Sequence, residues 1–453
     1  MKQILLTAMF LMLAFPYAGA QNPLLEAYIR EGLESNQGLK QKQLDYTRDL
    51  AALKEAKGMF LPDISLNARY TVARGGRIID FPVGDLLNPV YSTLNMLTAS
   101  EMFPQIENES FPFYRPTEHE TKVSLVQPIF SSDLIQNYQI RKEAAEVTRI
   151  DVERYKRELV KEITKAYYGY KKASNLLTLA DTSLYLVQEN LRVSRRLYEN
   201  DKVTVDAVYR SESELSKVEV QQAQARNMVE ASRAYFNFLL NRPLSSSIEL
   251  TEESPVPLMI SLDEATLRAL ENRDELHQIE TYMKMNEHMT ALHRGSNIPG
   301  LFGVVDYGFQ GEQYHFTHED DFLLASLVMR WNLFQGSTNH LKVQQSRIDG
   351  EKLDELYQET IQQIRLELIN HYYGLQAAFE SVESAAKQTN SALKAYQLIN
   401  RKYTEGQSSL LELIDARTSL TGAVANAIVA RSEYYSRLAD FECAMGANGL
   451  ENQ

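Results

Sequence analysis

The segment DISLNARYTV, residues 63–72, alternates strictly between apolar and polar side chains. This period of two is typical of a β-strand with one apolar face and one polar face. Alternation of the same kind recurs at three later places in the chain, each long enough to cross a bilayer as a tilted strand of about 9–11 residues. We therefore predict four strands, over residues 63–74, 119–130, 300–311 and 321–334.

Outward from these strands, long stretches of the chain lack the residues that interrupt helices. No proline lies between Pro128 and Pro243, and none follows Pro299. A proline inside a helix costs about 3 kcal/mol, so its absence favours uninterrupted helices. Apolar residues recur there at spacings of three and four among Glu, Gln, Lys and Arg, as in coiled coils. We predict a first helix over 24–59 and long helices over 133–198, 205–241, 336–402 and 410–446.

The N-terminus has the pattern of a secretory signal peptide. Lys2 precedes an apolar run from Ile4 to Phe15, and the small residues 18–20 then form a cleavage site. The run is too short to span a hydrocarbon core of about 30 Å as a helix. We expect residues 1–20 to be removed and the protein to be exported.

The two halves of the remaining sequence resemble each other, and the number of residues between matching positions changes along the chain. Pro62 falls on Pro299, 237 residues later, and the end of the chain matches an earlier stretch at an offset of 205. Most of the change in offset is due to residues 81–118, which hold five prolines and are expected to form one long loop in the first half only. We predict two structural repeats, 21–250 and 251–447, and a C-terminal tail, 448–453.

Composition excludes several classes of function. The chain has 60 acidic and 47 basic residues, a net charge of −13, which argues against nucleic acid or an anionic surface as the main partner. The single cysteine, Cys443, excludes an intrachain disulfide and is expected to be buried in the last helix. The ligand-rich segment 315–321 lies at a predicted hairpin tip and is interpreted as a solvated loop. We predict no catalytic residues, no cofactor and no metal site.

Four strands cannot close a barrel, because about eight are needed. Open sheet edges do not occur in lipid, so several chains would have to share one barrel. The predicted fold class is mainly α, with long coiled-coil helices and a small membrane β-region.

Residues 401–416, RKYTEGQSSLLELIDA, connect the last two predicted helices. They resemble the helix-turn-helix of the TolC family of bacterial outer-membrane efflux channels, and the order of elements is similar from about residue 22 to 446. The resemblance implies a homotrimer with a 12-stranded β-barrel in the outer membrane of a Gram-negative cell and a helical barrel extending through the periplasm. It implies a passive exit duct of a tripartite efflux or secretion system, not an enzyme. The implied partners are outer-membrane lipid, a periplasmic adaptor (membrane fusion protein) and an inner-membrane transporter.

The resemblance also implies a site at the periplasmic entrance. Glu412 and Asp415 match acidic residues that constrict it, and Tyr403 matches an aromatic residue there. The alternative is that both carboxylates lie on a solvated outer face. The first turn differs from the family pattern, because Asp201 replaces a glycine and Ala207 replaces an aspartate. Candidate adaptor-docking residues in the two turns are Lys202, Val203, Thr204, Gly406, Gln407, Ser408 and Ser409.

Two other classes stay open on sequence alone. A secreted or periplasmic coiled-coil scaffold without a pore would not need the strict alternation of residues 63–72. A periplasmic enzyme would need a catalytic cleft, and we find no serine–histidine–acid order or placed carboxylate pair. The exported substrate is not indicated by the sequence.

Overall fold

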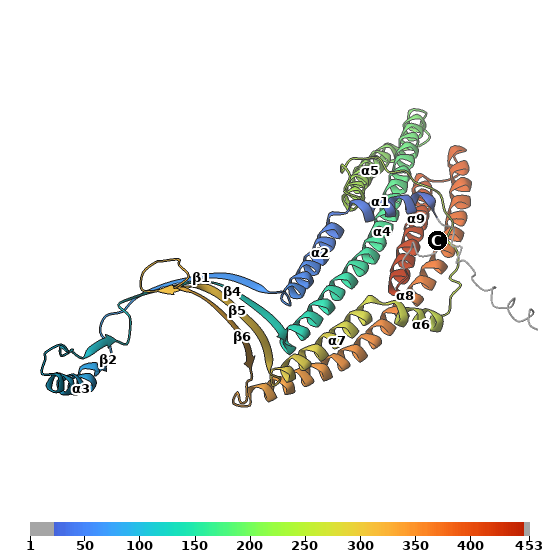
Figure 1. Cartoon of the computed structure of the whole chain (residues 1–453). Coiled ribbons are helices and arrows are strands. Elements are labelled where there is room, and N and C mark those ends of the chain that lie inside the picture. Colours follow the sequence, from blue (N-terminus) through green and yellow to red (C-terminus); the bar gives the residue numbers. More distant parts are fainter. Residues whose placement is uncertain (1–21, 448–453) are drawn as a thin grey trace, which may run out of the picture. The chain divides into compact units, whose positions relative to one another are not determined.

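The computed structural model describes residues 22–447, so the predicted signal peptide and C-terminal tail lie outside the described residues. The described chain divides into two compact units. The helical unit contains Lys142–Asn286 together with the residues up to Leu50 and from Ile348 onward, and the β unit contains Ala51–Arg141 and Glu287–Arg347. In chain order the elements are α1 (Pro23–Ser35), α2 (Gln37–Gly58), β1 (Asp63–Val72), β2 (Ile78–Phe81), α3 (Val83–Thr98), β3 (Glu109–Pro112), β4 (Thr117–Phe130), α4 (Ser132–Glu199), α5 (Val205–Leu239), α6 (Leu262–Asn272), α7 (Asp274–Gly295), β5 (Gly300–Gly311), β6 (Asp321–Arg330), α8 (Thr338–Thr404) and α9 (Leu410–Ala444) (Figure 1).

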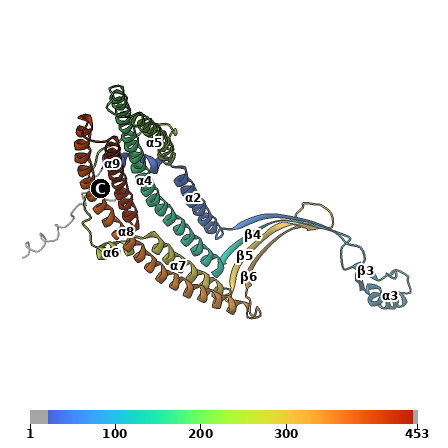
Figure 2. The ribbon, with the colours of Figure 1, turned by 180° about the vertical axis from the view of Figure 1, so that it is seen from behind.

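The β unit is built on one antiparallel sheet with the order β1-β4-β5-β6 (Figures 1 and 2). Its register brings the apolar positions of all four strands onto the same face. Ile64 pairs with Leu125, which pairs with Val305, and that residue pairs with Ala325. The next apolar row contains Leu66, Val123, Tyr307 and Leu323. The alternation seen in the sequence therefore becomes one continuous apolar face.

The opposite face of the sheet is charged. Lys122 Nζ lies 3.0 Å from a carboxylate oxygen of Asp306 and 3.1 Å from one of Glu120. Arg69 on β1 lies 3.3 Å from Glu120. These pairs cross from β1 through β4 to β5, so one side of the sheet is suited to water and the other to an apolar medium.

The fourth strand is shorter than predicted. β6 ends at Arg330, and residues 331–334 lie outside it. The indole nitrogen of Trp331 donates instead to the backbone oxygen of Asn297, 3.0 Å away.

The prediction of one long loop over residues 81–118 is wrong. This segment contains a 16-residue helix, α3, and the strand β3, which pairs with β2 in a small separate sheet. The prolines of this segment led us to predict a loop, but one of them, Pro89, lies inside the helix. Side-chain amides of Asn88 and Asn95 hold α3 to the chain that follows it, at Ile106 and Phe103.

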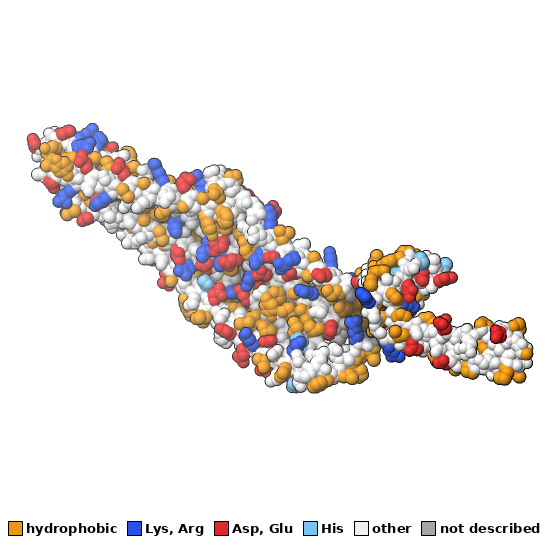
Figure 3. Space-filling view, turned by 90° about the vertical axis from the view of Figure 1, so that its left-hand side faces the viewer, with side chains coloured by type: hydrophobic (Ala, Val, Ile, Leu, Met, Phe, Trp, Pro, Cys, Tyr) orange, Lys and Arg blue, Asp and Glu red, His pale blue; other side chains and the backbone are white. Residues whose placement is uncertain are grey.

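The helical unit contains three apolar clusters among its described residues, of which two are large. The first surrounds Tyr167 and Phe236, both fully buried, with Tyr28 meeting Phe236 edge to face at 5.1 Å. The second surrounds the fully buried Leu368 and Phe441. Over the long helices, charged side chains of both signs are interspersed (Figure 3). Among the described helices, none is both long and apolar enough to cross a membrane.

The predicted helix over 24–59 is two helices, broken at Asn36. Asn36 has extended ψ, and its side chain both accepts from the N–H of Leu39 and donates to the backbone oxygen of Leu239 at 2.9 Å. Gly38 follows two residues later but lies inside α2, and periodicity alone did not predict the break. A second break, at Arg273 between α6 and α7, lies 237 residues later, which is the offset of the predicted repeat.

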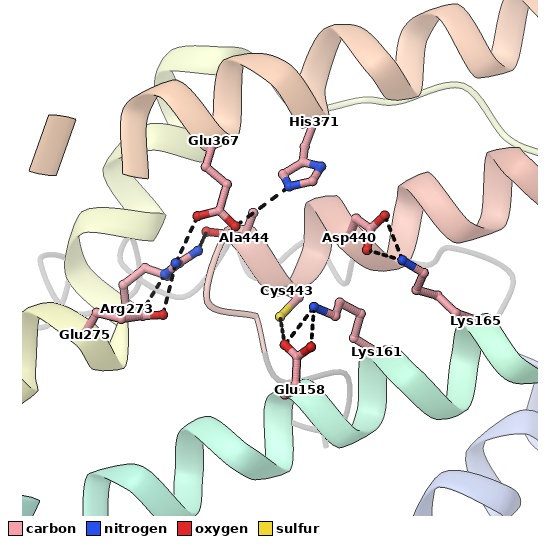
Figure 4. Close-up of polar contacts among 10 residues, drawn as sticks. All are labelled: Glu158, Lys161, Lys165, Arg273, Glu275, Glu367, His371, Asp440, Cys443 and Ala444. Atoms are coloured by element: carbon pink, nitrogen blue, oxygen red, sulfur yellow. Dashed lines mark hydrogen bonds and ion pairs between the residues drawn. The ribbon is translucent and has the colours of Figure 1, made fainter. Parts of the chain in front are cut away.

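Arg273 anchors this second break to the last helix. Its guanidinium donates to the backbone oxygen of Ala444 at 3.1 Å and pairs with Glu275 and Glu367 at 2.9 and 3.0 Å (Figure 4). Cys443 lies nearby and is partly buried, rather than fully buried as predicted. Burial raises the pKa of its thiol to about 11, so Cys443 stays a protonated thiol near neutral pH.

Candidate channel entrance at the helix turns

The turn between α8 and α9, called the second turn here, is closed by a glycine in the left-handed conformation. Gly406 has φ +75°. Its N–H donates to the backbone oxygen of Tyr403 at 3.0 Å, and the next N–H, of Gln407, donates to that of Lys402 at 2.8 Å. These bonds satisfy the last carbonyls of α8 in the manner of a glycine C-cap.

α9 begins with a reciprocal cap. The N–H of Glu412 donates to the hydroxyl of Ser409 at 3.3 Å, and the N–H of Ser409 donates to the Glu412 carboxylate at 3.0 Å. The hydroxyl of Ser408 donates to the same carboxylate. Hydrogen bonds from the Ser408 hydroxyl and then the Ser409 N–H hold the pKa of Glu412 below its ordinary value. The carboxylate is therefore fixed in its ionised form at a helix N-terminus, where negative charge is favoured.

Glu412 and Asp415 lie together on the exposed face of α9. The buried face of the same helix carries Leu413, fully buried, and Arg417, 4% exposed. Leu411 is also on the outer side, with 58% of its surface exposed. The two predicted acidic residues are thus exposed neighbours one helical turn apart, available to solvent or to another chain.

Tyr403 is buried beneath the two turns. Its side chain is 3% exposed and lies in an apolar cluster with Leu410, Leu413 and Ala207. Its hydroxyl is 3.2 Å from that of Ser194 on α4. Within one chain the ring therefore belongs to the core beneath the turns, and a role at the entrance requires it to leave that core.

The turn between α4 and α5, called the first turn here, uses other residues for the same shape. Asp201 takes the left-handed conformation with φ +53°, and the N–H of Lys202 donates to the backbone oxygen of Leu197 at 2.8 Å. Thr204 is the N-cap of α5 but makes no side-chain cap bond; its hydroxyl binds the Asp206 carboxylate instead. Among the candidate docking residues, Val203 and Ser408 are half-buried, and Lys202, Thr204, Gly406, Gln407 and Ser409 are exposed.

An ion pair that sequence reasoning missed joins the two helices that follow the turns. Arg417 on α9 donates to Glu214 on α5 at 2.8 Å. The signal in the sequence is its spacing, because Arg417 follows Leu410 and Leu413 on the buried face of the helix. Identifying the partner requires knowing that α5 and α9 are adjacent.

In the part of the chain that the structure describes, no three His, Cys, Asp or Glu side chains are close enough together to hold a metal ion. In the segment 315–321, His318 makes one contact, 3.2 Å, with Asp321 and is fully exposed.

Comparisons with known proteins agree with this fold. Residues 267–447 match the family model described as outer membrane efflux protein. The chain is 19% identical over 448 residues to the outer membrane protein TolC of Salmonella enteritidis, an alignment that covers 93% of this chain and 82% of that protein. It is also 19% identical over 444 residues to TolC of Escherichia coli strain K12.

Solved structures show the same fold. The CmeC outer membrane channel of Campylobacter jejuni has a TM-score of 0.75 at 14% identity, with 93% of this chain and 85% of that chain covered. The open state of the MtrE outer membrane channel of Neisseria gonorrhoeae has a TM-score of 0.71 at 17% identity, with 94% and 89% covered.

The fold is similar to that of the solved outer-membrane channels CmeC and MtrE. The predicted resemblance to the TolC family is confirmed: the second half matches the outer membrane efflux protein family, and almost the whole chain is similar to TolC. The description of that family is one of efflux proteins of the outer membrane.

Proposed function

We propose that this protein is the outer-membrane exit channel of a tripartite efflux or secretion system, conducting substrates passively from the periplasm to the exterior. The observation that carries this proposal is the sheet with one apolar face. Ile64, Leu66 and Leu323 on that face are 68%, 71% and 71% exposed in the single chain. Such a surface is unfavourable in water and is suited to the hydrocarbon core of a bilayer.

A trimer would complete the sheet. The edge strands are β1 and β6, and each has one side unpaired within the sheet. Unpaired strand edges are not tolerated in lipid, so β6 of one copy pairing with β1 of the next would close the structure. Three copies of four strands give a 12-stranded barrel, which is the arrangement that the family resemblance implies.

The two helix turns would form the periplasmic entrance. In a trimer, Glu412 and Asp415 each occur three times around one axis, and a ring of carboxylates attracts cations and repels anions. Glu412 supports this role because its caps keep it ionised and in place. The exposed turn residues, Lys202 to Thr204 and Gly406 to Ser409, would contact a periplasmic adaptor that connects the channel to an inner-membrane transporter.

Single-channel recording in planar bilayers tests the proposal. The purified protein should form ion-conducting, cation-preferring channels, and the double substitution Glu412→Gln and Asp415→Asn should lower the cation preference severalfold. Glu380→Gln with Glu383→Gln is a matched control, because these are exposed carboxylates at the same spacing on α8. The control should keep wild-type selectivity.

Two results would contradict different parts of the proposal. Absence of any conductance from protein extracted from outer membranes would overturn the channel function. Conductance with unchanged selectivity in the Glu412 and Asp415 double variant would leave the channel standing but remove these residues from the entrance.

A further inference from the structure

The segment between β1 and β4, residues 73–116 and called the insertion here, is folded around its helix by side-chain amides. Asn88 donates to the backbone oxygen of Ile106 and accepts from its N–H, both at 2.9 Å. Asn95 forms the same two-way bond with Phe103, at 2.7 and 3.0 Å. One face of α3 is therefore packed against the chain that follows it.

The opposite face of α3 is apolar and exposed. Val83, Leu86, Val90, Thr93 and Leu97 follow one another at spacings of three and four, which is the heptad pattern of a coiled-coil seam. Leu86, Val90 and Leu97 are 67%, 51% and 78% exposed. The insertion lies at the lower right of Figure 3, where orange hydrophobic side chains are visible on its surface. A seam of this kind packs against other helices of the same kind.

Charge makes a lipid surface an unsuitable partner for this face. Residues 78–112 contain five acidic side chains, Asp80, Asp85, Glu101, Glu107 and Glu109, and no lysine or arginine. Helices that lie on membranes carry basic residues on their polar face to meet anionic headgroups. α3 carries none, and its polar face is already bound within the insertion.

The sheet topology determines where the insertion emerges. Val72 at the end of β1 pairs with Thr117 at the start of β4, and the insertion joins these two residues. The other end of the same pair of strands, at Asp63 and Val126, is next to α2 and α4 in the chain. In a trimer, three insertions would thus emerge at the end of the barrel away from the long helices and around one axis.

We propose that the α3 helices of three copies pack through their heptad faces into a three-helix bundle across the outer mouth of the channel. This inference rests on the proposed function, because it requires the trimer. The occupant of each apolar face is then the same face of two other copies. The bundle would keep the outer end closed until its helices separate.

Cysteine cross-linking in the purified trimer tests the bundle. In a Cys443→Ser background, Val90→Cys places a thiol on the seam, and Ser92→Cys places one on another exposed face of the same helix. Oxidation should give at least tenfold more disulfide-linked dimer with Val90→Cys than with Ser92→Cys. Equal cross-linking of the two variants in an intact trimer would overturn the bundle.

A second variant examines closure without cysteine. Leu86→Glu with Leu97→Glu places charges on the seam and should raise single-channel conductance at least twofold while the protein remains trimeric. Unchanged conductance of such a trimer, or quenching of a probe at position 90 by brominated lipid, would overturn the proposal. Failure to form any trimer or any channel would instead count against the proposed function, and mass measurement in detergent distinguishes that case.

Discussion

The two helix turns have the same backbone shape but are stabilised by different residues. The second turn has Gly406 at its left-handed position and a reciprocal cap between Ser409 and Glu412. The first turn has Asp201 at the left-handed position and a Thr204 that makes no side-chain cap bond. The second turn is therefore the better stabilised of the two locally, and we expect the first turn to open more readily.

The largest expected effect concerns the core beneath the turns. Leu413 is fully buried, and its counterpart at the repeat offset, Val208, is 8% exposed. Leu413→Ala should lower the free energy of local opening by about 2–5 kcal/mol. Val208→Ala should cost about 1.5 kcal/mol, because less apolar volume is lost. Hydrogen exchange measured by mass spectrometry on segments 405–420 and 200–215 reports the change in local opening free energy for each substitution. Equal changes would contradict the expected difference between the cores beneath the two turns.

The ion pair between α5 and α9 is expected to matter next. Arg417→Ala leaves Glu214 without its buried partner, which should cost about 1–3 kcal/mol and loosen the two helices. Arg195→Ala is the control, since its 2.8 Å pair with Glu212 is exposed and worth about 0–1 kcal/mol. Single-channel conductance should rise with Arg417→Ala and not with Arg195→Ala. A conductance that rose with Arg195→Ala and not with Arg417→Ala would show that the Arg417 ion pair does not restrict the channel.

Much of this architecture followed from local patterns, and the failures have two causes. Period-two alternation predicted the strands, because side chains on one face of a sheet repeat every two residues. The absence of proline predicted the long helices. The break at Asn36 and the Arg417 ion pair were missed because each depends on a contact with a segment distant in sequence, with Leu239 and Glu214 respectively. The helix α3 was missed for another reason, because Pro89 lies inside it.

The burial of the candidate entrance residues could be predicted only in part. The exposure of Glu412 and Asp415 agrees with a helical face that the spacing of apolar residues already defines. The burial of Tyr403 does not follow from that spacing, because it depends on contact with Ser194 of α4. A resemblance to a family indicates which positions correspond, while burial depends on the neighbours that this chain places around them.

Exchanging the left-handed residues should reverse part of the difference between the turns. Gly406→Ala introduces a Cβ at φ +75°, which should cost about 1–2 kcal/mol. Asp201→Gly removes that strain from the first turn and should stabilise it by a few tenths to about 1 kcal/mol. Hydrogen exchange of the two turns is again the measurement. If Gly406→Ala had no effect, the left-handed glycine would not be a source of the second turn's stability.

A small mutational effect is also expected from the caps. Ser409→Ala removes the hydroxyl that accepts from the N–H of Glu412 and should cost about 1 kcal/mol. Thr204→Ala at the corresponding position of the first turn should change local opening little, since Thr204 makes no cap bond there. A similar cost for both substitutions would contradict the assigned difference in capping.

Acid should weaken the cap of the second turn through Glu412. Its pKa is lower in the folded turn than the ordinary value of 4.5, so its contribution to stability is fully present above about that pH and is lost as the pH falls through the lowered value. Asp206 in the first turn also has a lowered pKa, because the Thr204 hydroxyl binds it, so both turns respond to acid. The contribution of Glu412 is therefore isolated by comparing the wild type with Glu412→Gln, whose side chain at position 412 cannot ionise. Exchange of segment 405–415 should differ between wild type and Glu412→Gln at pH 7, and this difference should shrink as the pH falls through the lowered pKa, because protonated Glu412 no longer carries the charge that the helix N-terminus favours.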